Sequence, residues 1–128
     1  LHMLHHISLG VAELERSAAF YDAALFALGY ARVWANETAV GYGKPGGEDE
    51  FAIKLAPTGD KLSAPGFHIA FAAPSAEAVR HFYEAALGHG GECDGQPGER
   101  PAYGDYYYAA FVSDPDGHRI EAVINGAG

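Results

Sequence analysis

The segment DPDGHRIEAV, residues 114–123, contains one residue whose chemistry differs from that of its neighbours. Glu121 lies among Ile120, Ala122 and Val123, in a stretch that resembles a strand built for burial. An ionised carboxylate in an apolar interior costs on the order of several kcal/mol, or changes its protonation state, unless a partner compensates it. We therefore expect a partner to hold Glu121.

An internal repeat supplies two candidate partners. Shifting the sequence by 62 residues aligns, without a gap, HISLGVAELERSAAFYDAALFALG (6–29) with HIAFAAPSAEAVRHFYEAALGHGG (68–91). His6 then aligns with His68. Strand alternation places both histidines and Glu121 on faces turned away from the helices, so the three are predicted to share one cleft. Two imidazoles and a carboxylate suit a divalent first-row metal ion such as iron, manganese, zinc, nickel or cobalt.

The repeat predicts two copies of one supersecondary unit. In each copy an alternating strand precedes a helix, which Gly29 ends in the first copy and which runs over about 75–87 in the second. Three short strands follow each helix: 30–35, 38–43 and 50–56, then 91–94, 106–112 and 118–124. The residues DPDG (114–117) predict a hairpin turn, and DGQPGERPA (94–102) a mobile loop.

The predicted fold class is therefore α+β, with tandem βαβββ modules at 4–57 and 67–125 joined by a linker at 58–66. The composition fits this size, because 128 residues with 48% hydrophobic side chains can build such a core. A net charge of −9 without a basic cluster excludes nucleic acid and anionic membranes as partners. One cysteine, Cys93, fits a reducing, cytoplasmic environment. The opening LHM is expected to be a vector remnant before a natural start at Met3.

The repeat, the element order and the C-terminal motif together resemble the vicinal oxygen chelate superfamily, which contains glyoxalase I, bleomycin-resistance proteins, fosfomycin-resistance enzymes and extradiol dioxygenases. The resemblance covers 4–124 and is most specific in HHISLGVAELERSAAFYDAAL, HIAFAAPSAEAVRHFYEAAL and FVSDPDGHRIEAV. It implies modules that curl into open, incomplete barrels around a cleft. It also implies a divalent metal held there by His6, His68 and Glu121.

One histidine and one lysine bear on this assignment of ligands. His5 competes for the first ligand place, but its alternation directs it toward the helix side. Lys54 aligns with the place at which glyoxalase I takes a fourth, carboxylate ligand; a shift of one residue would give Ile53 instead. Because an ammonium cannot ligate a cation, we expect a three-ligand site and not strict glyoxalase I activity. We predict that Lys54 points outward or to the rim, away from Glu121, because a buried lysine beside a divalent cation would be repelled.

Three residues are the predicted substrate contacts: Tyr106, Tyr108 and Arg119. The two tyrosines share the face of Glu121 if Ser113 pairs with His118 across the turn. A slip of one residue in this pairing substitutes Tyr107 and Phe111. The arginine is expected to meet an acidic substrate. The other histidines of the second half are expected to be solvated: His81, His89 and His118.

The resemblance implies that the metal binds two neighbouring oxygens of a substrate and stabilises an enolate-like or oxyanion charge. We expect a metal-dependent lyase, isomerase or oxygenase acting on a small carbonyl or oxygen-rich compound, with Glu121 as a catalytic residue. The alternative is a metal-free binding or sequestration protein of the bleomycin-resistance type. A homodimer is expected in either case, because two such modules make only an open cleft; the modules lie side by side or are exchanged between chains.

Overall fold

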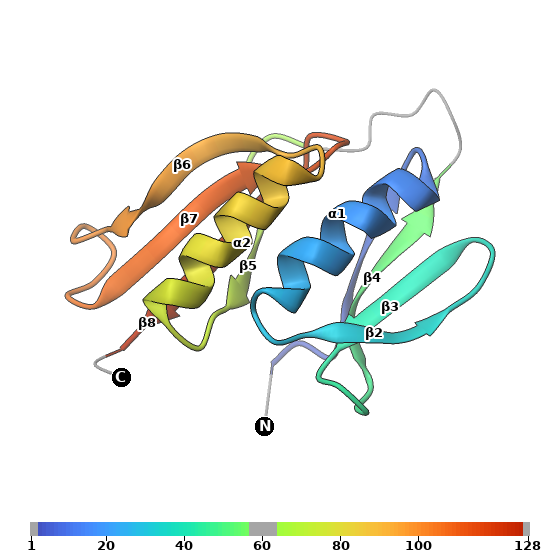
Figure 1. Ribbon diagram of the computed structural model, residues 1–128, viewed down its shortest axis with the longest axis horizontal. Helices are drawn as coiled ribbons and strands as arrows, with labels where there is room; N and C mark the ends of the chain where they lie inside the picture. Colours follow the sequence, from blue (N-terminus) through green and yellow to red (C-terminus); the bar gives the residue numbers. More distant parts are fainter. Residues whose placement is uncertain (1–2, 57–63, 127–128) are drawn as a thin grey trace.

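The computed structural model describes residues 3–56 and 64–126, in which two four-stranded sheets each carry one helix (Figure 1). The first module contains β1 (Ile7–Val11), α1 (Leu14–Phe26), β2 (Ala31–Ala35), β3 (Ala39–Gly43) and β4 (Asp49–Leu55). The second contains β5 (His68–Ala72), α2 (Ala76–Gly88), β6 (Glu92–Glu99), β7 (Tyr107–Ser113) and β8 (Arg119–Asn125). The predicted α+β class with tandem βαβββ modules and open sheets is confirmed. Pro57 and 58–63 of the predicted linker lie outside the described residues.

The two sheets have the same topology, as the repeat predicts. Their orders are β1-β4-β3-β2 and β5-β8-β7-β6, in which the first pair of each sheet is parallel and the others are antiparallel. Each helix covers one face of its sheet, because alternate strand residues are apolar and buried against it. This core includes Val11, Phe20, Leu25, Ile53, Val79, Phe82 and Ile120.

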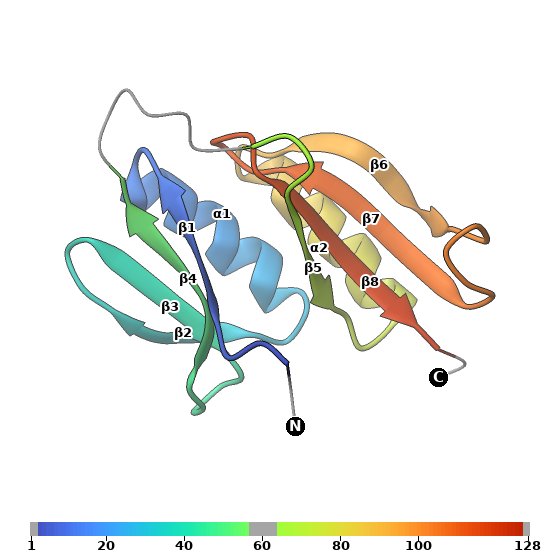
Figure 2. The same ribbon diagram turned by 180° about the vertical axis from the view of Figure 1, so that it is seen from behind.

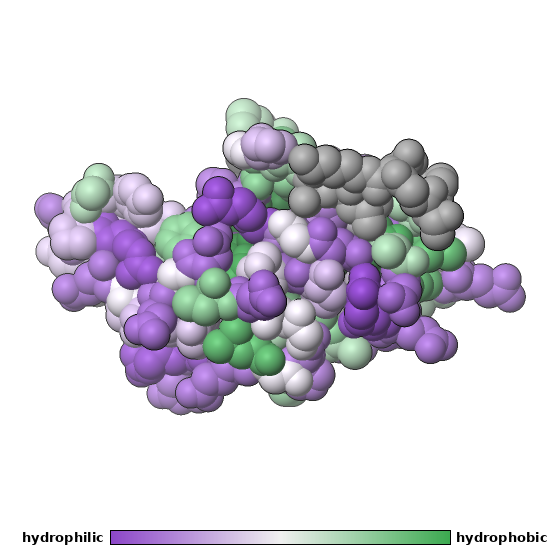
Figure 3. Space-filling view, turned by 90° about the horizontal axis from the view of Figure 1, so that it is seen from above, coloured by the Kyte–Doolittle hydropathy of each residue, from purple (hydrophilic) through white to green (hydrophobic). Residues whose placement is uncertain are grey.

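Both helices lie on the same side of the molecule. α1 and α2 pack against each other (Figure 1), and the view from behind shows both sheets in front of them (Figure 2). The sheet faces turned away from the helices therefore point in one direction. The surface seen from above is mainly hydrophilic with smaller apolar patches (Figure 3). Within the described residues, no helix is long and apolar enough to span a membrane.

The predicted mobile loop at 94–102 is wrong over its first part, because β6 continues to Glu99. β6 is an edge strand, where Pro97 can lack a backbone N–H without losing a ladder bond. The pairing with β7 shifts register around Gly95 and Gly98, so bulges accommodate the glycines that suggested a loop. Gly29, in contrast, ends α1 as expected, with a φ of 93° that favours glycine.

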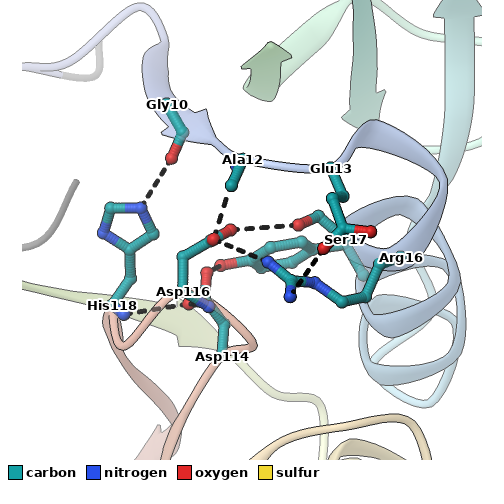
Figure 4. Close-up of polar contacts among 9 residues, drawn as sticks. Gly10, Ala12, Glu13, Arg16, Ser17, Asp114, Asp116 and His118 are labelled. Carbon is teal, nitrogen blue, oxygen red and sulfur yellow. Dashed lines mark hydrogen bonds and ion pairs between the residues drawn. The ribbon is translucent and has the colours of Figure 1, made fainter. Parts of the chain in front are cut away.

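The turn between β7 and β8 forms a polar contact between the modules (Figure 4). Asp116 in this turn reaches the first turn of α1, where its Oδ1 accepts hydrogen bonds from Arg16 Nη2 at 2.8 Å and from the backbone N of Ala12 at 3.4 Å. Its Oδ2 accepts from the buried hydroxyl of Ser17 at 3.2 Å. One carboxylate thus joins residues that lie about a hundred positions apart in the sequence.

Asp114 and His118 complete this junction from the two ends of the turn. Asp114 Oδ2 accepts a hydrogen bond from Tyr21 Oη at 2.5 Å, and its Oδ1 accepts from the backbone N of Asp116 and of His118, both at 2.9 Å. His118 Nε2 donates to the carbonyl of Gly10 at 2.8 Å. The predicted solvated role of His118 is wrong, since the residue is only 2% exposed. A residue in a turn is usually exposed, but here the first module covers the turn that contains His118.

The Asp116 contacts predict a large cost for removing this carboxylate. Asp116→Ala leaves the buried Ser17 hydroxyl without its acceptor and should lower the free energy of unfolding by about 2 to 3 kcal/mol. Asp105→Ala, which removes an exposed carboxylate of the same type, should change it by about 0.5 kcal/mol or less. Urea unfolding of both variants measures the difference. Equal stability of the two would show that the junction contributes nothing.

Asp114 predicts a specific pH dependence. Burial raises the pKa of Asp114 above its ordinary value of 3.8, while hydrogen bonds from Tyr21 and the His118 backbone oppose this shift. The native protein therefore holds this proton more tightly than the unfolded chain, and the free energy of unfolding falls as pH rises through the raised pKa. Asp114→Asn removes the titration. The stability of the parent relative to this variant should decrease from pH 4 to pH 7; a flat or rising difference contradicts the prediction.

Candidate functional site

Strand register places Glu121 on the open face of the second sheet. β8 lies between β5 and β7, and Glu121 pairs with Ala70 on one side and with Phe111 on the other. Directly paired residues share a face, so all three side chains point away from α2. The flanking Ile120 and Ala122 are buried in the core on the opposite face. The alternation seen in the sequence is thus the alternation of the strand.

Two side chains hold the Glu121 carboxylate, which is 1% exposed. His68 Nε2, on a half-exposed ring, lies 3.2 Å from Glu121 Oε1. Tyr107 Oη donates a short hydrogen bond to Oε2. Burial, then the hydrogen bond to Glu121 and the charge of Glu121, raise the pKa of Tyr107 to about 12. The tyrosine therefore stays protonated at neutral pH and remains a donor to this carboxylate.

The predicted pairing of Ser113 with His118 is wrong by one residue. Ser113 pairs with Arg119. The residue that faces His118 is Asp114, whose backbone N donates to the His118 carbonyl and closes the turn. The alternative register, with Tyr107 on the Glu121 face, is the one present.

Tyr106 and Tyr108 therefore do not lie on the Glu121 face. Tyr108 points toward α2, where its hydroxyl accepts a hydrogen bond from Arg80 Nη1 at 3.3 Å. Tyr106 precedes β7 and is 63% exposed. Arg119 does lie on the open face beside His68, its register partner, and its Nη2 contacts Asp94 Oδ2 at 2.9 Å. The ion pair fixes this guanidinium next to the candidate ligands.

His6 lies apart from the other two predicted ligands. It precedes β1, and its Nδ1 is 2.8 Å from Nδ1 of His5. Across 3–56 and 64–126, no three His, Cys, Asp or Glu side chains gather closely enough to hold a metal ion. A single chain therefore brings together His68 and Glu121, and the complete triad stays a prediction.

The register also corrects the assignment of Lys54. The repeat aligns Ser8 with Ala70, and their parallel partners are Ala52 and Glu121. Ala52, not Lys54, is thus the structural counterpart of Glu121. Its methyl group offers no ligand, so this position of the first module supplies no fourth carboxylate. Lys54 is exposed on the open face of the first sheet, and within the described residues no acidic side chain lies within 4.0 Å of its ammonium.

Trp34 occupies the open face of the first sheet and was not singled out from the sequence. It pairs with Gly41, the neighbour of Ala52, and a Cβ at Gly41 would overlap the indole. Gly41 in turn is the counterpart of Phe111, since Gly41 pairs with Ala52 as Phe111 pairs with Glu121. In the sequence, the indication was a single tryptophan in one predicted strand and a glycine in the next predicted strand. The first module therefore places an aromatic ring over the position of Phe111 and a methyl group at the position of Glu121.

The donor chemistry of the second sheet fits a divalent metal ion. An imidazole nitrogen and a carboxylate oxygen lie side by side, and these are the ligand types preferred by zinc and its first-row neighbours. The hydroxyl of Tyr107 is neutral, so among the described contacts only His68 can offset the charge of Glu121. Two protein donors leave several coordination positions for a further ligand and a substrate.

Comparison with known proteins agrees with this architecture. A family model described as the Glyoxalase/Bleomycin resistance protein/Dioxygenase superfamily matches residues 3–122. A search of curated proteins gave no match. A glyoxalase/bleomycin resistance protein from Albidiferax ferrireducens T118 has a structure with 37% identity and a TM-score of 0.83, over 95% of this chain and 98% of its own. A glyoxalase-related enzyme from Fulvimarina pelagi has 25% identity and a TM-score of 0.73, over 99% and 94%.

The fold alone is shared with the fosfomycin resistance protein FosX from Listeria monocytogenes, at 20% identity and a TM-score of 0.70 over 99% of this chain and 96% of that one.

The packing of the Trp34 indole on Gly41 predicts a change in tryptophan fluorescence. Gly41→Ala places a methyl group where the indole lies, so the single tryptophan of the chain must move toward solvent and its emission should shift to longer wavelength. Gly88→Ala is the matched control, because nothing lies within 4 Å of a Cβ at that position. Its emission should equal that of the parent. Unchanged emission of the Gly41 variant would mean that the indole does not rest on this glycine.

Proposed function

The chain belongs to the Glyoxalase/Bleomycin resistance protein/Dioxygenase superfamily, and on this premise we propose that it is a metal-dependent enzyme acting on a small carbonyl or oxygen-rich compound. The observation that carries the proposal is the buried Glu121 carboxylate with His68 at 3.2 Å. The reaction belongs to the lyase, isomerase or oxygenase type. Strict glyoxalase I activity does not fit, because the counterpart position on the first module is Ala52.

Charge supports a metal ion over a side-chain counter-ion. A buried carboxylate requires compensation, and no described lysine or arginine lies within ion-pair distance of Glu121. Arg119, the nearest in register, is already paired with Asp94. A divalent cation beside His68 supplies the missing charge.

The third ligand in this proposal is His6 of a second protein copy. His6 and the His68–Glu121 pair belong to different open faces of one chain, and the two faces point the same way (Figure 2). A homodimer can place the first face of one protomer against the second face of its partner. His6 of one protomer then meets His68 and Glu121 of the other, as in a dimer with exchanged modules. Both copies complete one site each.

Around such a site the residues of this chain have distinct tasks. The metal, when bound, polarises two neighbouring oxygens of the substrate and stabilises the negative charge that forms on them. Tyr107 keeps one carboxylate oxygen of Glu121 hydrogen-bonded, which orients the other toward the ion. Phe111 forms an apolar wall beside Glu121. Arg119 contacts Asp94 through Nε and Nη2, so its Nη1 can meet an acidic group of the substrate. Glu121 is thus the proposed ligand and catalytic residue.

The division of the site between protomers predicts complementation. His6→Ala and Glu121→Gln homodimers each lack a ligand in both sites, so each should bind zinc about tenfold or more weakly than the parent. A heterodimer of the two variants has one site with His6, His68 and Glu121 all intact. Purified through two different tags, it should retain one tightly bound zinc ion per dimer, measured by elemental analysis. Retention of none would place all ligands in one chain.

Lys54→Ala is the control for charge near the site, and it should leave zinc binding unchanged. Equal zinc content in the parent and in Glu121→Gln would contradict a metal site at Glu121 altogether.

Light scattering at tens of micromolar should give a dimer of the 13.5 kDa chain. The loaded parent is then screened with 1,2-dicarbonyl, epoxide and catechol compounds. Binding without turnover of any of these would favour the sequestration protein.

A further inference from the structure

A cavity of about 250 Å³ lies between the modules, at the start of β1 and beside β5. Its interior is apolar and largely aromatic, because core side chains from both modules reach it: Leu25, Tyr42, Phe51, Ile69 and Phe71. Polar side chains of His5, His6, Tyr30 and Glu50 also line it, together with the exposed Leu4. Neither His68 nor Glu121 lines it, so it is distinct from the carboxylate pair, and it shares only His6 with the proposed metal ligands.

The aromatic rings line this cavity, and the hydroxyl groups of its two tyrosines are engaged in hydrogen bonds elsewhere. Tyr30 Oη donates to the carbonyl of Ala72 at 2.8 Å, which ties the rim of one module to the other. Tyr42 Oη donates to Asp22 Oδ1 at 2.9 Å, away from the cavity. The ring of Phe51 packs edge to face on Phe71 at 5.1 Å between centroids. The interior therefore offers π-systems and hydrocarbon without a free donor.

Glu50 is the only carboxylate that lines the cavity, and it is exposed at the rim. Within the described residues, no cationic side chain lies within 4.0 Å of it. After burial, the negative charge of Glu50 is the second cause that raises the pKa of Tyr30, so the carboxylate acts on the same space. The two histidines that line the cavity contact each other, with their Nδ1 atoms 2.8 Å apart.

We propose that this cavity binds a small organic monocation: an ammonium group at the Glu50 rim with a compact hydrocarbon or aromatic body among the rings. The electron-rich faces of tyrosine and phenylalanine attract a cation, and the carboxylate adds charge attraction. The apolar interior takes up the body of the ligand. The net charge of −9 favours the approach of cations and repels anions. This inference goes beyond the metal site and does not depend on it.

The test uses three probes of one shape: benzylammonium, benzyl alcohol and benzoate. Titrated into the full chain as purified, and followed by amide NMR shifts, benzylammonium should shift Leu25 and Phe51 and bind about fivefold more tightly than benzyl alcohol. Benzoate should not bind. Glu50→Gln should weaken benzylammonium about fivefold and leave benzyl alcohol unchanged. Glu37→Gln, which removes an exposed carboxylate away from the cavity, should alter neither.

Equal affinities for the charged and the neutral probe would overturn the proposal, and so would equal losses in the Glu50 and Glu37 variants. Shifts confined to residues away from the cavity would overturn it as well. The zinc content of Glu50→Gln separates this outcome from the metal proposal, because Glu50 is not one of the proposed ligands. Normal zinc binding with no probe binding rejects the cavity alone. Normal probe binding with no zinc binding rejects the metal site alone.

Discussion

The arrangement of this molecule depends on one polar contact, the docking of the β7–β8 turn onto the start of α1. β1 and β5 are edge strands of separate sheets, so backbone pairing does not fix the modules relative to each other. Asp114 and Asp116 do so instead, by accepting hydrogen bonds from Arg16, Ser17 and Tyr21. Buried hydrogen bonds are directional and costly to leave unmade, so few orientations satisfy all of them. The packing of α1 on α2 agrees with the same orientation.

That orientation determines the chemistry open to a single chain. With both helices on one side, the opposite faces of both sheets are left uncovered by the helices (Figure 2). Among the described residues, Glu121 is buried and contacts a half-exposed imidazole and a neutral hydroxyl. Burial of a carboxylate with so little compensation is unfavourable by itself, and this imbalance is the basis of the proposed metal site. The junction and the site are thus linked, because the turn that docks on α1 leads directly into β8.

The sequence predicted the features that repeat or alternate. The 62-residue repeat predicted two modules with the same succession of elements, and the position of Glu121 between apolar neighbours predicted its face. It failed where one residue of turn geometry decided the outcome, as in the pairing that placed Tyr108 instead of Tyr107 beside Glu121. It also failed for His118, whose burial comes from the other module and has no local pattern. The register between two strands is set by tertiary contacts and turn geometry, and the alternation within one strand does not distinguish registers that differ by one residue in the partner.

The two halves of the duplication carry different side chains at corresponding positions. The position that holds Glu121 in the second module holds Ala52 in the first, and the position of Phe111 there is Gly41 here. Both exchanges remove side-chain volume from the first sheet, and the indole of Trp34 takes up the space above Gly41. The second face therefore presents a carboxylate beside an aromatic ring, while the first presents the indole of Trp34 beside a methyl group. Because Lys54 lies exposed on that same first face, a partner placed opposite it meets an aromatic ring and a positive charge.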